Sequence, residues 1–184
     1  AFERAKGMVS QIKDLDEAKG KAKTPDERQK AQQALNVHYN EIGRLFELAL
    51  SLRDENTTPA AVAQARYLLS YVFMRQRKSF DAFILARYCM THDKVNNPDI
   101  ALDATEIAIA SAVQAYIDAP DGDKTFELDL VKGICEQIVS EYPQSAKGNE
   151  ARMRLGQVYR DLDEPEQAAE VYLSVPKDYS EFPS

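Results

Sequence analysis

The residues of this chain that could do chemistry are few, and none stands at a spacing typical of an enzyme. Two histidines, His38 and His92, and two cysteines, Cys89 and Cys135, are spread over 184 residues. The sequence contains no Gly-x-Ser-x-Gly nucleophile motif, no phosphate loop and no His-Glu-x-x-His zinc motif. We therefore expect no catalysis by this chain, no bound cofactor and no metal ion.

Each of these side chains also has a structural explanation. His38 lies on the apolar stripe of a predicted helix, which favours a hydrogen-bonded core histidine over a ligand or a base. His92 stands at a predicted helix end, where a cation meets the negative pole of the helix dipole. The two cysteines are 46 positions apart and fall at interior helix positions, so we expect buried free thiols rather than nucleophiles.

Charged clusters suggest two further kinds of site. Five carboxylates lie between residues 118 and 129, but an EF-hand turning at Gly122 would need Ile117 and Ala119 as calcium ligands, which excludes it. The basic run at residues 75–78 suggests nucleic acid or anionic lipid, yet we favour a solvated helix end. Residues 1–98 carry a net charge of +4 and residues 99–184 carry −11, which favours no nucleic-acid partner. A solvated dipolar surface, head-to-tail contact and a basic partner remain open.

The elements that must position these residues are helices. Only 15 of the 184 residues are Gly or Pro, and residues 24–25, 58–59 and 97–98 each place a capping residue before a proline. An apolar stripe predicts a long helix over about 25–53, antiparallel to a weaker helix near 2–19. Strand patterns are absent, so we predict an all-α fold. Asp103 and Glu106 interrupt the longest apolar stretch, so we expect no membrane span.

One segment recurs along the chain. Residues 65–89 align without a gap on residues 151–175, at an offset of 86, and this alignment places Ser70 on Gly156. Such small residues allow two helices to cross closely. A weaker copy lies around Ala112, with additional residues in the loop that follows it. We predict three helix pairs, over 59–96, 97–143 and 144–180, and an N-terminal helical hairpin over 1–58 that packs on them. Because the chain begins with Ala1 inside a helical pattern, we expect a fragment of a longer protein.

The last copy carries a family resemblance. Leu155, Gly156, Tyr159, Ala168 and Tyr172 resemble the tetratricopeptide repeat (TPR) family, although the spacing of about 43 residues exceeds the common ~34. The Glu-Tyr-Pro-Gln-Ser junction over 141–145 is similar to repeats of bacterial cell-envelope TPR proteins. The resemblance implies a right-handed superhelix of antiparallel helix hairpins, whose first helices line a concave, partner-binding surface.

We expect that surface to be formed by first-helix residues outside the helix-crossing set. Tyr67 and Tyr71 are one turn apart and have the chemistry of interface anchors, or else the helix over 25–53 covers them as core. The predicted lining residues are Gln64, Tyr67, Tyr71, Met74, Arg75, Ala110, Gln114, Asp118, Met153, Gln157 and Arg160.

The predicted function is a scaffold that binds a partner protein or peptide, without catalysis. The alternatives are self-association into a homo-oligomer and helical support for a catalytic domain outside this sequence. The sequence leaves the compartment open between the bacterial periplasm or cell envelope and the cytoplasm.

Overall fold

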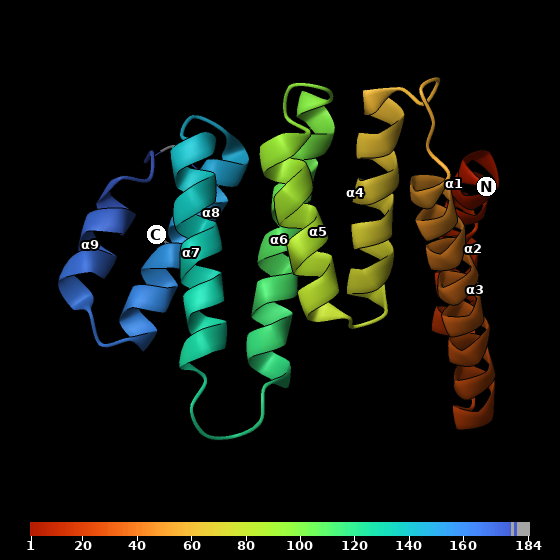
Figure 1. Cartoon of the computed structure of the whole chain (residues 1–184). Helices are drawn as coiled ribbons and strands as arrows, with labels where there is room; N and C mark the ends of the chain where they lie inside the picture. The colour runs from red at the N-terminus through yellow and green to blue at the C-terminus, as the bar shows by residue number, and fades with distance from the viewer. Residues whose placement is uncertain (178, 180–184) are drawn as a thin grey trace.

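The described part of the chain is built from helices alone. The structure is a computed structural model that describes residues 1–177 and 179, and within them it contains nine helices and no strand (Figure 1). The helices are α1 (Phe2–Ser10), α2 (Ile12–Lys21), α3 (Pro25–Ser51), α4 (Pro59–Arg75), α5 (Ser79–His92), α6 (Pro98–Asp118), α7 (Thr125–Glu141), α8 (Ala146–Asp161) and α9 (Pro165–Leu173). The predicted all-α class is confirmed.

The starts of the longer helices follow from their capping residues. The side chains of Thr24, Thr58 and Asn97 each accept a hydrogen bond from a backbone N–H in the first turn of α3, α4 and α6. Thr24 also forms a full capping box with Glu27. Ser145 caps α8 in the same way, although no proline follows it. Because these interactions are local, the starts of α3, α4 and α6 could be predicted from the sequence.

The N-terminal helix differs from its prediction, because it is broken at Gln11 into α1 and α2. The carbonyl of Met8 accepts a tight-turn hydrogen bond from the Gln11 N–H and lies 2.8 Å from His38 Nε2. A carbonyl only accepts, so Nε2 donates. His38 of α3 thus binds the Met8 carbonyl just before the break.

The helices pack mainly on their neighbours in the chain. α1 and α2 lie on α3, α3 on α4, and each later helix on the next, with further contacts from α6 to α4 and to α8 (Figure 1). Two hydrophobic clusters result. The N-terminal cluster is built from α1 to α4, with Phe46 and Ile42 at its centre, and the larger cluster is built from α5 to α8. Tyr71 of α4 packs against both clusters.

The internal repeat is visible in the backbone. Arg77 follows α4 and Asp163 follows α8, 86 residues apart, and these two are the described non-glycine residues with positive φ, 59° at each. The N–H of the next residue then donates to a carbonyl of the preceding helix: Lys78 donates to Phe73 in α4, and Glu164 donates to Tyr159 in α8. Both helices therefore end in the same left-handed turn.

The predicted close helix crossing is also present. A Cβ atom built on Gly156 of α8 would lie 2.5 Å from Cε1 of Tyr172 on α9, far inside van der Waals contact. Ser70 of α4, the corresponding residue of the first pair, is fully buried, whereas Val113 of α6, the corresponding residue of the middle pair, is partly buried. In the first and last pairs a small side chain at this position therefore allows the second helix to approach the first closely.

Substitution of this glycine tests the crossing. Gly156→Ala is expected to lower the free energy of unfolding by about 1–3 kcal/mol, because the added methyl group displaces the Tyr172 ring. Gly133→Ala is the matched control, since Gly133 lies within α7 and its Cβ would meet nothing within 4 Å. We expect that change to stabilise the protein by up to about 1 kcal/mol through helix propensity. Equal effects of both substitutions in urea unfolding would contradict the crossing.

Candidate functional site

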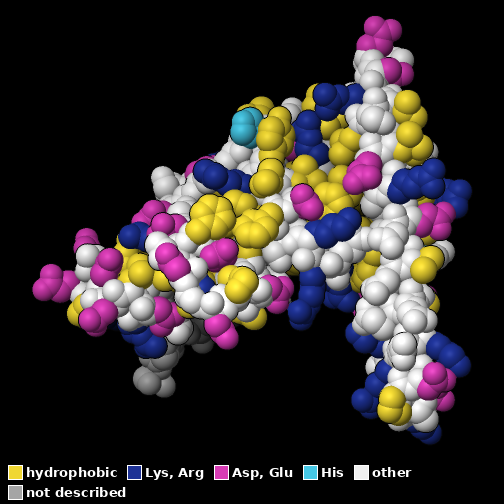
Figure 2. Space-filling view, turned by 60° about the horizontal axis from the view of Figure 1, so that its bottom comes forward, with side chains coloured by type: hydrophobic (Ala, Val, Ile, Leu, Met, Phe, Trp, Pro, Cys, Tyr) yellow, Lys and Arg dark blue, Asp and Glu magenta, His cyan; other side chains and the backbone are white. Residues whose placement is uncertain are grey.

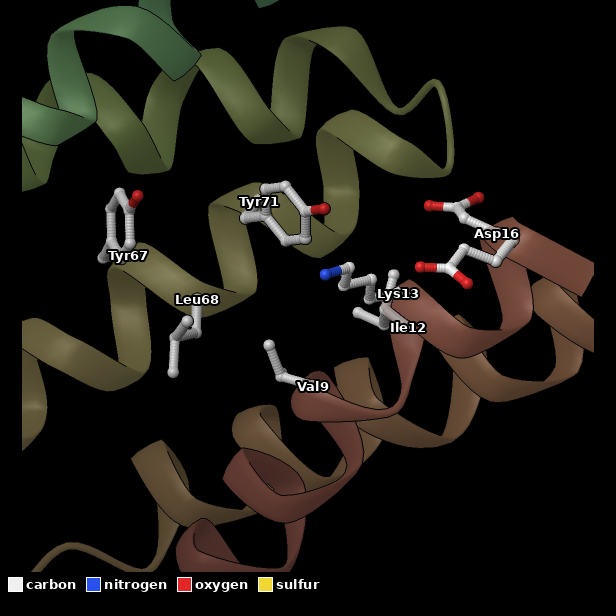
Figure 3. A pocket seen from close by; sticks show the side chains of 8 residues that line it. Val9, Ile12, Lys13, Asp16, Tyr67, Leu68 and Tyr71 are labelled. Carbon is white, nitrogen blue, oxygen red and sulfur yellow. The ribbon is translucent and has the colours of Figure 1, made fainter. Parts of the chain in front are cut away.

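A groove lies between the N-terminal helices and α4. It has a volume of about 670 Å³, within the range of ligand-binding clefts. Figure 3 shows Tyr67, Leu68 and Tyr71 of α4 on one wall, and Val9, Ile12, Lys13 and Asp16 of α1 and α2 on the other. Glu17 completes the lining. The floor is apolar and the margins are charged.

The two tyrosines predicted as anchors stand side by side on the α4 wall. Both are partly buried, and both pack their rings against the larger hydrophobic cluster. Burial raises the pKa of Tyr67, and the nearby carboxylates of Asp103 and Glu106 raise it further. The wall that faces them comes from α1 and α2 rather than from α3, which the sequence had suggested as their cover. They therefore have core contacts on one side and an open groove on the other.

An ion pair fixes the end of the groove. Nη2 of Arg75, at the last position of α4, donates to Oδ2 of Asp16 on α2 at 2.6 Å. Nε of the same guanidinium donates to the hydroxyl of Tyr39 on α3 at 2.9 Å. Arg75 thus joins three helices, and the predicted partner-binding arginine is already engaged within the protein.

A second groove continues along α4 beyond this ion pair. It has a volume of about 570 Å³ and also borders Asp16, so the two grooves share that residue. Met74, Arg75 and Gln114 of the predicted set line it. Its lining includes Lys19, Tyr39 and Arg77, which makes it more polar than the first groove.

The remaining predicted residues do not line these two grooves. Gln64 is partly buried near the start of α4, Ala110 is exposed on α6, and Asp118 pairs with Arg77 at 3.5 Å. Met153, Gln157 and Arg160 lie on α8, Met153 partly buried and the other two exposed. The structure thus gathers four of the five predicted α4 residues and Gln114 of α6 around the grooves, and it leaves Gln64, the other α6 residues and the α8 residues outside them.

The wall formed by α1 and α2 was not predicted from the sequence. Val9, Ile12 and Asp16 recur at intervals of three and four residues, which is the spacing of one helix face. This spacing was the signal in the sequence that could have predicted the wall. Its position opposite α4 depends on the break at Gln11, which no local pattern indicated.

The side chains with potential for catalysis or metal binding are accounted for structurally. His38 is partly buried and bonded to the Met8 carbonyl, and His92 ends α5 with its ring stacked on Tyr88. Cys89 and Cys135 are free and completely buried, as predicted, and burial raises the pKa of each thiol to about 12. Within the described residues, no group of three or more His, Cys, Asp or Glu side chains could hold a metal ion.

The surface charge is unevenly distributed. Figure 2 shows acidic side chains gathered over the end formed by the last helices, and Lys and Arg at the margin of the hollow beside the N-terminal helices. α6 is long and apolar enough by composition to cross a membrane, and half of this apolar segment is buried inside the protein. The only charged side chains of α6 are acidic.

Comparison with protein-family models, curated proteins and solved structures finds no match for this chain.

The buried thiols predict a specific chemical behaviour. In the folded protein we expect Cys89 and Cys135 to react with a maleimide about a thousandfold more slowly than an exposed thiol, because reaction requires opening of the core. The pKa of each thiol is raised in the folded state, so the associated stability is complete below about pH 9 and is lost as the pH rises toward about 12. Labelling followed by mass spectrometry, with a Glu17→Cys variant as the exposed reference, measures the first effect. Rapid labelling of the native cysteines would contradict their burial.

Proposed function

We propose that this chain is a protein-interaction module without catalytic activity of its own, which binds a segment of a partner protein in the groove between α2 and α4. The observation that carries this proposal is the pair Tyr67 and Tyr71 on one wall of that groove. Aromatic rings anchor many interfaces because they bury a large area at little entropic cost.

We further propose that the three helix pairs form a TPR-like right-handed superhelix. The shared left-handed turns at Arg77 and Asp163, and the crossing at Gly156, support a repeated unit. Successive packing of α4, α6 and α8 supports a common face of first helices. On this proposal α6 is a core helix rather than a membrane span, because its neighbours bury half of its apolar segment.

Selection from a displayed random-peptide library tests groove binding. We expect peptides selected on the wild-type protein to bind Tyr71→Ala at least about tenfold more weakly, since hot-spot aromatics contribute ~2 kcal/mol or more. Phe126→Ala is the control, because Phe126 is 62% exposed on α7 and lies outside the groove. Fluorescence anisotropy measures the affinities.

A second variant guards against loss of fold, because Tyr71 contacts both hydrophobic clusters. Glu17→Cys introduces an exposed thiol on the opposite wall, and a bulky maleimide attached there should block the groove. Unlabelled Glu17→Cys is the reference for this comparison, so that only the effect of the attached maleimide is measured. If no peptide is selected, or if neither Tyr71→Ala nor the blocked variant weakens binding, the proposed function is wrong.

Self-association is the second candidate function, and one surface favours it. Phe80 and Ile84 of α5 and Phe126 of α7 are exposed, and the Phe80 and Phe126 ring centroids lie 6.2 Å apart. Exposed apolar patches mark association surfaces. If the patch joins two copies, Ile84→Glu converts a concentration-dependent mass into a monomer in analytical ultracentrifugation, whereas Lys13→Glu, outside the patch, has no such effect. A monomeric wild type at all concentrations would exclude this candidate.

A further inference from the structure

The groove between α2 and α4 contains hydrogen-bond donors that the protein itself does not use. Within the described residues, neither the Lys13 ammonium group nor the Tyr67 and Tyr71 hydroxyls have a hydrogen-bond or ion-pair partner. Figure 3 shows the Lys13 side chain extending across the groove toward Tyr71. Three donors around an apolar floor favour a ligand that supplies acceptors.

The carboxylates that line this groove are already neutralised. Asp16 is paired with Arg75 at 2.6 Å, and Glu17 with Lys21 at 3.4 Å. When the partners Arg75 and Lys21 are counted with the lining residues, one positive charge is left over, on Lys13. Such a site attracts a carboxylate and repels a Lys or Arg side chain.

The second groove continues the positive charge along α4. It borders the ammonium of Lys19 and the guanidinium of Arg77, and the contact of Arg77 with Asp118 is long, at 3.5 Å. Lys19 has no ion-pair partner among the described residues. A segment that leaves the first groove past the ion pair of Asp16 and Arg75 therefore meets further positive charge.

The opposite end of the first groove is negatively charged. There the carboxylates of Asp103 and Glu106 on α6 raise the pKa of the Tyr67 hydroxyl. Glu106 is paired with Lys147 at 2.7 Å, whereas Asp103 has no ion-pair partner in the described residues. The acidic end of the molecule lies beyond α6 (Figure 2). The charge gradient along α4 thus orients an acidic ligand with its carboxylates toward α2 and away from α6.

We propose that the occupant of the groove is an acidic, amphipathic segment of a partner protein, which rests apolar side chains on Val9, Ile12 and Leu68 and places side-chain carboxylates on Lys13 and, farther along, on Lys19 and Arg77. The inference rests on the proposed function, because it names the chemistry of the segment that the groove binds. It differs from recognition of a chain terminus, since the donors face an open groove that a second groove extends past Asp16 along α4.

Three probe peptides test the charge preference. Each is a fluorescent peptide of about twelve residues, blocked at both ends, with the same leucine pair followed by three glutamates, three glutamines or three lysines. Fluorescence anisotropy on the full chain should give at least about tenfold tighter binding of the glutamate peptide than of the glutamine peptide, with the lysine peptide weakest. Added salt should weaken the glutamate peptide more than the glutamine peptide.

Two charge-matched variants locate the effect. Lys13→Ala should weaken the glutamate peptide about two- to fivefold and leave the glutamine peptide unchanged, because one partly exposed ion pair is lost. Lys132→Ala removes the same charge from α7, outside the groove, and should leave both peptides unchanged. Lys13 is exposed, so its replacement should not disturb the fold.

The outcomes separate this inference from the proposed function. Equal binding of the glutamate and glutamine peptides, with both lost in the blocked Glu17→Cys variant, overturns the acidic preference and leaves groove binding intact. Tightest binding of the lysine peptide, equal effects of Lys13→Ala and Lys132→Ala, or no binding of any probe also overturns the acidic preference. Groove binding itself is decided by the library selection.

Discussion

The rest of the structure depends on α4 being packed from two sides. Ala65, Leu69 and Val72 belong to the N-terminal cluster, whereas Tyr67, Tyr71 and Met74 pack against the larger one, and Tyr71 also contacts the N-terminal cluster. Each set follows a helical spacing of four and then three residues, and the two sets are displaced by two residues, which places them on nearly opposite faces of the helix. α4 therefore fixes the N-terminal helices relative to the helix pairs, and the outer parts of its tyrosines have only the groove to face.

Local chemistry explains how much of the fold could be predicted. Thr24, Thr58 and Asn97 act within three residues of their own position, so each helix start could be read from its neighbours in sequence. The crossing at Gly156 could be predicted because the internal alignment of the chain places a second small residue, Ser70, at the same position. The break at Gln11 was not predicted, and the interaction found beside it, between the Met8 carbonyl and His38, joins residues 30 positions apart.

The candidate site was predicted only in part for the same reason. Tyr67 and Tyr71 were found because aromatic residues one turn apart on a first helix are a local pattern. Their opposite wall comes from a segment more than fifty positions earlier, and the ion pair of Asp16 and Arg75 joins residues 59 positions apart. A single sequence carries no sign of such a pairing. Arg75 was therefore predicted as a free binding residue, although the fold uses it to hold α2.

The groove exists because α2 packs on α3 and not on α4. Ile12 is the one fully buried residue of α2, and its other side chains are partly or fully exposed. The ion pair of Asp16 and Arg75 spans from α2 to α4 at the end of the groove without filling the space beside it. Where α8 and α9 cross closely at Gly156, Tyr67 and Tyr71 of α4 instead line an opening beside the N-terminal helices. At the repeat offset of 86, Tyr67 and Tyr71 align with Met153 and Gln157, so this wall carries larger, aromatic side chains than the matching face of α8.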